Sequence, residues 1–171
     1  MTSSAGAVIR PPQPALENRL SAVGAENRLI GAPRWLGPLA SDRAIEVYAS
    51  TNDVAPGGTV SVHVSTSPAA SYRIVVYRLG WYGGVGARRM ACLPSCSGSR
   101  RGTTEAMPSP EPTGRILAGW PNTDTVTIGR GWVSGYYLVR ALLLNGPQSG
   151  RSATTYVVVN ARRRDSKILI Q

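Results

Sequence analysis

The chain is 171 residues long, and 19 lysines and arginines against nine acids give it a formal net charge of +10. This length suits one domain with a substantial core, and no apolar run reaches the roughly 20 residues of a membrane-spanning helix. The arginines are scattered over predicted strands and turns, so the charge does not indicate nucleic-acid binding. No signal peptide is visible, which leaves the compartment open between the cytoplasm and secretion with a missing or misassigned N-terminus.

Residues 1–41 are predicted to form an extended, partly disordered leader. The segment contains five prolines and shows no sustained helical or strand period. Two near-repeats, at 15–20 and 24–29, can each form a short helical turn but have no core of their own. Trp35 is expected to dock on the domain that follows.

Residues 42–160 are predicted to form an immunoglobulin-like domain. In 59–66, three valines alternate with polar residues, which is the pattern of a half-buried antiparallel strand. Short strands separated by turn signals, without a long helix, predict an all-β, immunoglobulin- or fibronectin-like antiparallel sandwich. The expected strands are 44–50, 59–66, 72–79, 87–92, 124–128, 136–144 and 152–160. The expected inner face includes Val60, Val62, Val64, Ile74, Val76, Leu138 and Val158.

The stretch 72–86, YRIVVYRLGWYGGVG, is the centre of the predicted fold. A strand rich in tyrosine and branched residues runs into four glycines, which allow a sharp reversal of the chain. Further along, 134–137 opens a strand with two tyrosines. This is the position at which immunoglobulin-like domains place a structural corner tyrosine.

Two other segments lie outside the predicted strands. Residues 95–113 form a polar, proline-containing excursion that is long for a compact domain, so it is either mobile or functional. Within it 98–113, together with 1–25, are expected to be the least ordered parts. Residues 161–171 are expected to be a linker and the truncated start of a following domain.

No residue is predicted to be catalytic. His63 is the only histidine and lies on the polar side of its strand, which indicates a surface side chain. The glycine-rich turn is not followed by the helix that a phosphate-binding loop requires. With one histidine and two cysteines, no metal site is expected.

Cys92 and Cys96 form a C-x3-C pair. They are either two loop thiols or a local disulfide, which an oxidising compartment would favour, and the sequence leaves both open.

The candidate binding residues are an arginine and four aromatic side chains in or beside loops. Exposed rings beside a cation can form a face for a sugar or a protein partner. The alternative is that the rings cover the two ends of a sandwich that contains no phenylalanine. These residues are Arg78, Trp81, Tyr82, Trp120 and Trp132.

Several short motifs together resemble one known family. The most specific is YRLGWYGG at 77–84. The others lie at 45–50, 55–57, 62–66, 72–74 and 134–138, with a lead-in formed by 26–29, Gly31 and Trp35. On these motifs, the stretch from about 26 to 170 is similar to the N-terminal β-sandwich region of N,N-dimethylformamidase large (beta) subunit-like proteins.

The resemblance implies a parent protein that hydrolyses non-peptide C–N bonds. In that family the chemistry belongs to a large domain after the sandwich, with one iron held by tyrosine and glutamate side chains. No residue here matches an iron ligand or a catalytic position, so no cofactor is expected in this segment.

The resemblance and the exposed rings lead to two functions from different classes. The first is a non-catalytic accessory or interaction domain of such a hydrolase, whose partner is the following catalytic domain or a partner subunit. The second is a stand-alone binding module for glycans or a cell surface.

Overall fold

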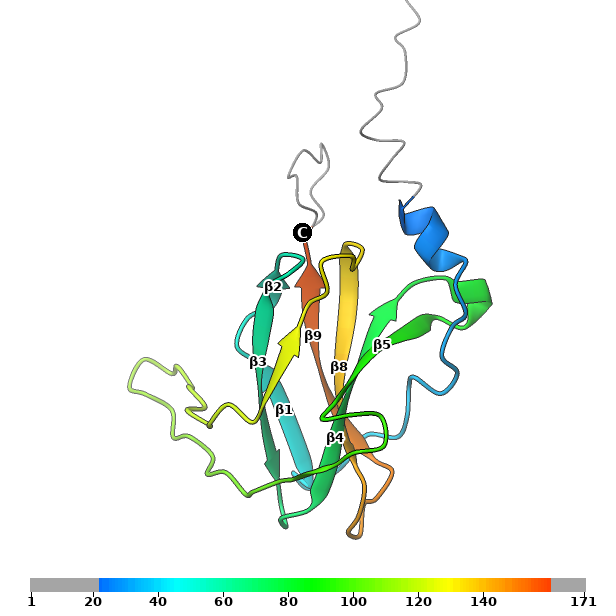
Figure 1. Ribbon diagram of the computed structural model, residues 1–171. Coiled ribbons are helices and arrows are strands. Elements are labelled where there is room, and N and C mark those ends of the chain that lie inside the picture. Colours follow the sequence, from blue (N-terminus) through cyan, green and yellow to red (C-terminus); the bar gives the residue numbers. More distant parts are fainter. Residues whose placement is uncertain (1–21, 161–171) are drawn as a thin grey trace, which may run out of the picture.

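Alternating apolar residues build two sheets that face each other across one core. The structure is a computed structural model that describes residues 22–160, and 1–21 and 161–171 lie outside the described part. The small sheet has the order β1-β3-β7, and the large sheet has the order β2-β9-β8-β4-β5, with β6 also paired to β4 (Figure 1). The all-β, immunoglobulin-like sandwich predicted from the sequence is confirmed. The strands are β1 (Ile45–Ala49), β2 (Asp53–Val54), β3 (Thr59–Thr66), β4 (Ser71–Leu79), β5 (Ala87–Leu93), β6 (Arg100–Arg101), β7 (Asp124–Thr127), β8 (Gly135–Leu143) and β9 (Ser152–Val159).

Each of the seven expected strands is present, with ends that differ by at most one residue. The sequence did not reveal the two-residue strands β2 and β6. β2 lies inside a predicted turn and pairs in parallel with β9, and β6 lies in the polar excursion and pairs with β4. Helical structure in the described part includes residues 22–27 and the short 3-10 turn η1 (Tyr82–Gly84). No helix among these residues is long and apolar enough to cross a membrane.

The core lies between the sheets, and five of the seven residues predicted for it are there. Val62 and Ile74 are among the side chains that are fully buried. The prediction was wrong for Leu138 and Val158, which point out of the core because their neighbours Tyr137 and Val157 point into it. A strand's side chains alternate, so a starting point one residue off reverses every assignment in that strand.

Of the two tyrosines at the expected corner position, Tyr137 is the one that fills it. Its ring is fully buried, and its hydroxyl donates a 2.6 Å hydrogen bond to the carbonyl of Val133, four residues earlier. Trp132 stacks on it with ring centroids 5.0 Å apart. Burial raises the pKa of Tyr137 well above its usual range, so this tyrosine is a neutral hydrogen-bond donor that fixes the start of β8.

A buried carboxylate links the two sheets. Asp124, on β7, accepts a 2.7 Å hydrogen bond from the hydroxyl of Tyr72 on β4. It also pairs at 2.6 Å with Arg100 of β6, whose side chain is about half exposed. The Asp124 side chain is completely buried, and the pairing with Arg100 compensates the loss of its hydration.

The chain before β1 packs on the outer face of the large sheet. We call residues 22–41 the lead-in. A second apolar cluster forms there, in which Trp35 and Leu138 pack against Val75 and Tyr77. The described part of the predicted leader is therefore a covering layer, whereas the predicted disorder within 1–21 falls outside the described residues.

Arginines of the sheet hold this lead-in by its main-chain carbonyls. Arg140 is buried and donates to the carbonyls of Arg34 and Trp35, and Arg151 donates to that of Leu39. Main-chain hydrogen bonds add to them, including one from the amide of Ala40 to Ser152. Since a guanidinium carries five donors in a fixed plane, it can bind several carbonyls at once.

The excursion after β5 crosses the outer face of the small sheet. His63 stacks on Tyr48 at 4.4 Å, and its Nδ1 lies 2.8 Å from the carbonyl of Trp120. Because Nδ1 faces carbonyls, it carries the proton. Tyr48 also donates to the carbonyl of Ala118 and contacts the Trp120 ring. His63 is thus half-buried and holds the returning loop on the sheet.

Candidate functional site at the glycine corner

The candidate site is the corner between β4 and β5, where the lead-in meets the sandwich. Two glycines allow the close approach. A Cβ on Gly80 would lie 2.4 Å from the side-chain oxygen of Asn27, and one on Gly86, whose φ is +93°, would lie 3.1 Å from the Trp35 ring. Only glycine fits both requirements at Gly86. The corner is therefore shaped by residues of the lead-in as well as by its own turn.

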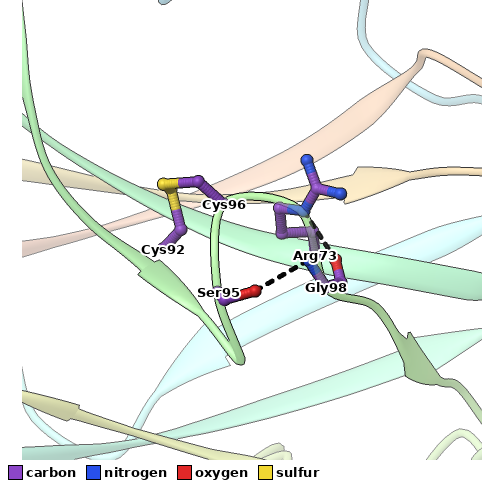
Figure 2. The surroundings of a disulfide bond; sticks show 5 residues. All are labelled: Arg73, Cys92, Ser95, Cys96 and Gly98. Atoms are coloured by element: carbon purple, nitrogen blue, oxygen red, sulfur yellow. Dashed lines mark hydrogen bonds between the residues drawn. A yellow bond between two sulfur atoms is a disulfide. The ribbon is translucent and has the colours of Figure 1, made fainter.

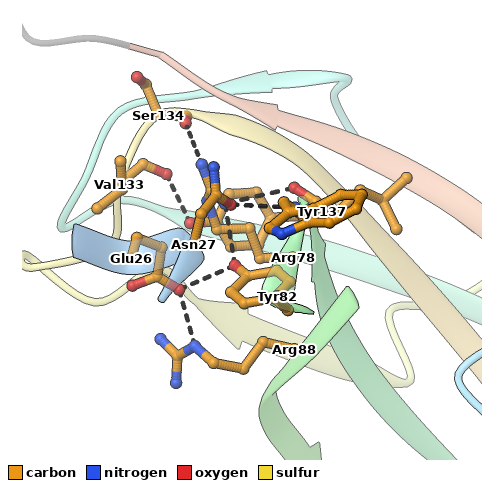
Figure 3. A network of polar contacts seen from close by, with 10 residues as sticks. Glu26, Asn27, Arg78, Tyr82, Arg88, Val133, Ser134 and Tyr137 are labelled. Carbon is orange, nitrogen blue, oxygen red and sulfur yellow. Dashed lines mark hydrogen bonds and ion pairs between the residues drawn. The ribbon is translucent and has the colours of Figure 1, made fainter. Parts of the chain in front are cut away.

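A polar network lies beneath this corner (Figure 3). The hydroxyl of Tyr82 donates to Glu26 Oε1 at 2.9 Å and accepts from Arg78 Nη1, also at 2.9 Å. Arg88 Nε donates to the same Glu26 oxygen at 2.7 Å. One carboxylate of the lead-in thus binds the η1 turn and β5 directly, and the Tyr82 hydroxyl links it to Arg78 at the end of β4.

Neighbouring main-chain groups complete the network. The side-chain oxygen of Asn27 accepts from Arg78 Nη1 at 3.4 Å and from the amide of Trp81 at 3.2 Å. Arg78 Nη2 donates to the carbonyl of Ser134 at 3.2 Å, beside the corner of Tyr137. Arg78 is 3% exposed, and its Nε has no hydrogen-bond partner in the described part of the chain.

The protonation states follow from this arrangement. Burial alone would raise the pKa of Glu26, but hydrogen bonds from Arg88 and Tyr82 and the nearby guanidinium charges outweigh it and lower that pKa. Burial raises the pKa of Tyr82, and the bond to Glu26 raises the pKa of Arg88. At neutral pH the corner therefore holds a carboxylate, a neutral phenol and two guanidinium ions.

These residues do not fit the iron that the family resemblance implies for the parent protein. In residues 22–160 no three histidine, cysteine or acidic side chains lie together. Glutamate and tyrosine do meet at Glu26 and Tyr82, but Glu26 Oε1 is bound by Arg88 and the phenol keeps its proton. A tyrosine binds ferric iron as the phenolate. Two guanidinium ions already lie beside this oxygen, and their positive charges would repel a metal cation bound to it.

The structure does not bring the five predicted binding residues onto one face. Arg78 and Tyr82 are buried in the network, whereas Trp81 between them in the sequence is 69% exposed. Trp132 stacks on Tyr137 at the same end of the sandwich. Trp120 lies apart, on the small sheet. Binding by these residues stays a prediction, and within the corner Trp81 is the one whose ring is available.

Sequence reasoning missed the partners that the lead-in supplies. Glu26 and Asn27 stand out in the sequence only as part of a motif, and nothing in their spacing indicates contact with Tyr82 or Trp81. The available signal was that the lead-in motif and the YRLGWYGG motif occur together in one family. Residues shared by two distant motifs are candidates for contact with each other.

Cys92 and Cys96 form a disulfide at the end of β5 (Figure 2). The bond closes a tight loop, and the amide of Gly98, just after this loop, donates to the hydroxyl oxygen of Ser95 at 2.8 Å. Arg73 of β4 donates to the Gly98 carbonyl at 2.7 Å. The loop is thereby fastened to the sheet before the chain enters β6, away from the corner network.

The sequence comparison decides the family. A protein-family model described as N,N-dimethylformamidase beta subunit-like, C-terminal, matches residues 73–171, more than half of the chain. The chain belongs to this family. The description refers to a C-terminal region, whereas the resemblance of the motifs indicates an N-terminal one. No curated protein matches the chain.

The comparison with solved structures gives matches at low sequence identity and low TM-scores. Domain 1 of VCBP3 from Branchiostoma floridae has 11% identity and a TM-score of 0.39, covering 70% of this chain and 96% of that one. The sulfur carrier protein SoxY from Chlorobium limicola f thiosulfatophilum has 12% identity and a TM-score of 0.30, with 84% and 96% covered. A β-glucosidase from Listeria innocua has 13% identity and a TM-score of 0.28, with 68% of this chain and 16% of that chain covered.

Proposed function

We propose that this dimethylformamidase beta subunit-like chain is a non-catalytic accessory sandwich that binds the hydrolase part of such an enzyme, on the same chain or on a partner subunit. The observation that carries the proposal is the glycine corner. Its charged and phenolic groups contact one another below the surface, while an apolar ring, Trp81, faces outward. Such a corner suits binding and offers no reactive group to a substrate.

The distribution of apolar surface supports an interaction role. Eight of the exposed large apolar side chains come from the lead-in, the corner and the outward side of β8 and β9, and three come from the excursion. A surface enriched in such side chains is typical of a protein contact. The eight are Leu29, Ile30, Leu36, Leu39, Trp81, Val85, Tyr136 and Tyr156, and the three are Met107, Ile116 and Leu117.

The test uses the full 171-residue chain and the hydrolase part of a family member expressed without its own sandwich. The chain alone is expected to release no dimethylamine from N,N-dimethylformamide and to hold no stoichiometric iron. Isothermal titration calorimetry is expected to show binding to the hydrolase part with a Kd in the micromolar range or below. A micromolar Kd corresponds to a binding free energy of about −8 kcal/mol. An unrelated immunoglobulin-like sandwich is the control. Turnover by the chain alone, or the absence of binding, would overturn the proposal.

A further inference from the structure

We infer that Trp81 is the central contact of a docking surface at the glycine corner, and that its partner is a protein face with an apolar centre and an acidic rim. We call Leu29, Ile30, Trp81 and Val85 the corner patch. The inference rests on the proposed function, because it takes the hydrolase part as the partner, and it adds which surface binds and what chemistry the partner presents.

The corner patch is both exposed and apolar. Ile30 is 92% exposed, Trp81 69%, Leu29 47% and Val85 38%. These values are high for a branched aliphatic side chain and a tryptophan, whose burial is strongly favourable. Covering a patch of this kind releases apolar surface from water, and that is the main contribution to most protein contacts.

The four residues lie together although they come from two segments. A Cβ on Gly31 would lie 2.7 Å from the Val85 Cβ, so the main chain next to Ile30 lies against Val85. The side chain of Asn27, two residues before Leu29, accepts from the Trp81 amide. The lead-in and the η1 turn therefore present one surface, as Figure 1 shows for the helical segment beside the corner.

Hydrogen bonds within the chain hold the main chain that carries Trp81. The Trp81 carbonyl accepts from the amides of Gly84 and Gly86, at 2.8 and 3.4 Å, and its amide is held by Asn27. The next residue, Tyr82, is 2% exposed and belongs to the polar network. An aromatic ring on a fixed main chain loses little entropy on binding, which is the property of residues that dominate protein interfaces.

The charge around the patch selects the partner. Residues 22–37 and 77–91, which build the corner, contain five arginines and a single acid, Glu26, which is buried and bound to Arg88. Arg28, Arg34 and Arg89 are exposed. A second copy of this chain would bring the same cations against each other, whereas a partner with acidic residues around its apolar centre complements them.

The neighbours of Trp81 favour a protein over a glycan. A sugar ring stacks on an aromatic face, but its hydroxyl groups also need hydrogen-bond partners. The side chains beside Trp81 in the patch are aliphatic and supply none, and the arginines around the patch donate hydrogen bonds but accept none. They suit an apolar protein surface.

The experiment measures binding of the full chain and its variants to the same hydrolase part. Trp81→Ala is expected to weaken binding about 30-fold or more, with an unchanged melting temperature because the ring is exposed. Leu117→Ala, which also removes an exposed apolar side chain but on the excursion, is the matched control and is expected to bind like the wild type. Arg89→Glu is expected to slow association and to weaken its dependence on salt.

The outcomes separate this inference from the proposed function. Wild-type binding that Trp81→Ala leaves unchanged would overturn the docking surface but not the accessory role. Failure of the wild type to bind would overturn both. Self-association of the wild type that Trp81→Ala abolishes would replace the acidic partner by a second copy. If soluble oligosaccharides quenched the tryptophan fluorescence of the wild type but not of Trp81→Ala, the ligand of the corner patch would be a glycan and not an acidic protein face.

Discussion

Tyr82 and Glu26 are 56 residues apart in the sequence, and the phenol of the first donates a 2.9 Å hydrogen bond to the carboxylate of the second. Both side chains are nearly inaccessible to solvent. Through this contact the lead-in becomes part of the domain, because Tyr82 also accepts from Arg78 at the end of β4. The turn that presents Trp81 is thus fixed from below by a residue that precedes the first strand.

Tyr82→Phe should destabilise the domain by about 1–3 kcal/mol, because Glu26 loses one hydrogen-bond donor and Arg78 loses its shortest contact in a buried place. The lead-in should loosen first. Hydrogen exchange should therefore speed up at the amide of Ala32, which is bonded to Ala87 across the lead-in and β5. Tyr136→Phe, which removes the hydroxyl of a half-exposed ring, is the control. Equal protection of Ala32 in both variants would show that the Tyr82 hydroxyl does not hold the lead-in.

Val62→Asp tests the core. Val62 is completely buried between the sheets, so the variant would place an unpaired carboxylate there and should lose several kcal/mol of stability or fail to fold. Thr125→Asp, at an exposed position of the adjacent strand, should change stability by less than about 1 kcal/mol. Urea denaturation compares the two. If Val62→Asp unfolded at the same urea concentration as the wild type, the register of β3 would be wrong.

Cys96→Ser should lower the stability of the chain by about 2 kcal/mol, the value that the chain-entropy relation gives for so short a loop. Because Gly98, just after this loop, accepts from Arg73, amide protection at the start of β6 should fall as well. Ser97→Ala, an exposed change directly after Cys96, is the control. Intact-protein mass spectrometry after alkylation without reductant should show no free thiol in the wild type, and two labelled cysteines would contradict the bond.

The strands could be predicted because their residues carry the information locally. Alternation in 59–66 places Val62 inside, and the two tyrosines after Gly135 mark the position of the corner without showing which of them fills it. Leu138 was misplaced because apolar residues stand at both odd and even positions of 136–144, so the sequence does not show which face of the strand is inward. The burial and the hydrogen bond of Tyr137 show that the odd-numbered residues face the core.

The candidate site depends on contacts that local patterns cannot show. Trp81 and Tyr82 are consecutive aromatic residues in one turn, yet one is exposed and the other buried. The difference comes from Glu26 and Asn27, which reach the turn from a segment without a strand period. Composition predicts that such a segment is loosely held, and here four arginines of the sandwich, Arg78, Arg88, Arg140 and Arg151, hold it instead.

The lowered pKa of Glu26 predicts how stability changes with pH. The ordinary value for a glutamate is 4.5, and in the folded chain hydrogen bonds from Arg88 and Tyr82 outweigh burial and bring the pKa below it. The unfolded chain therefore takes up the proton first as the pH falls. The stabilisation from the charged carboxylate is complete above about pH 5 and is lost as the pH falls through the folded pKa.

Glu26→Gln removes this contribution, so its deficit in unfolding free energy relative to the wild type should be larger near pH 7 than near pH 3. Glu111→Gln, at an exposed position of the excursion, should show nearly the same small difference at both pH values. Urea unfolding curves of the wild type and both variants at the two pH values give all six unfolding free energies. If the deficit of Glu26→Gln were the same at both, the carboxylate would not be held in its charged form by the corner, and the network would stabilise the domain through neutral hydrogen bonds alone.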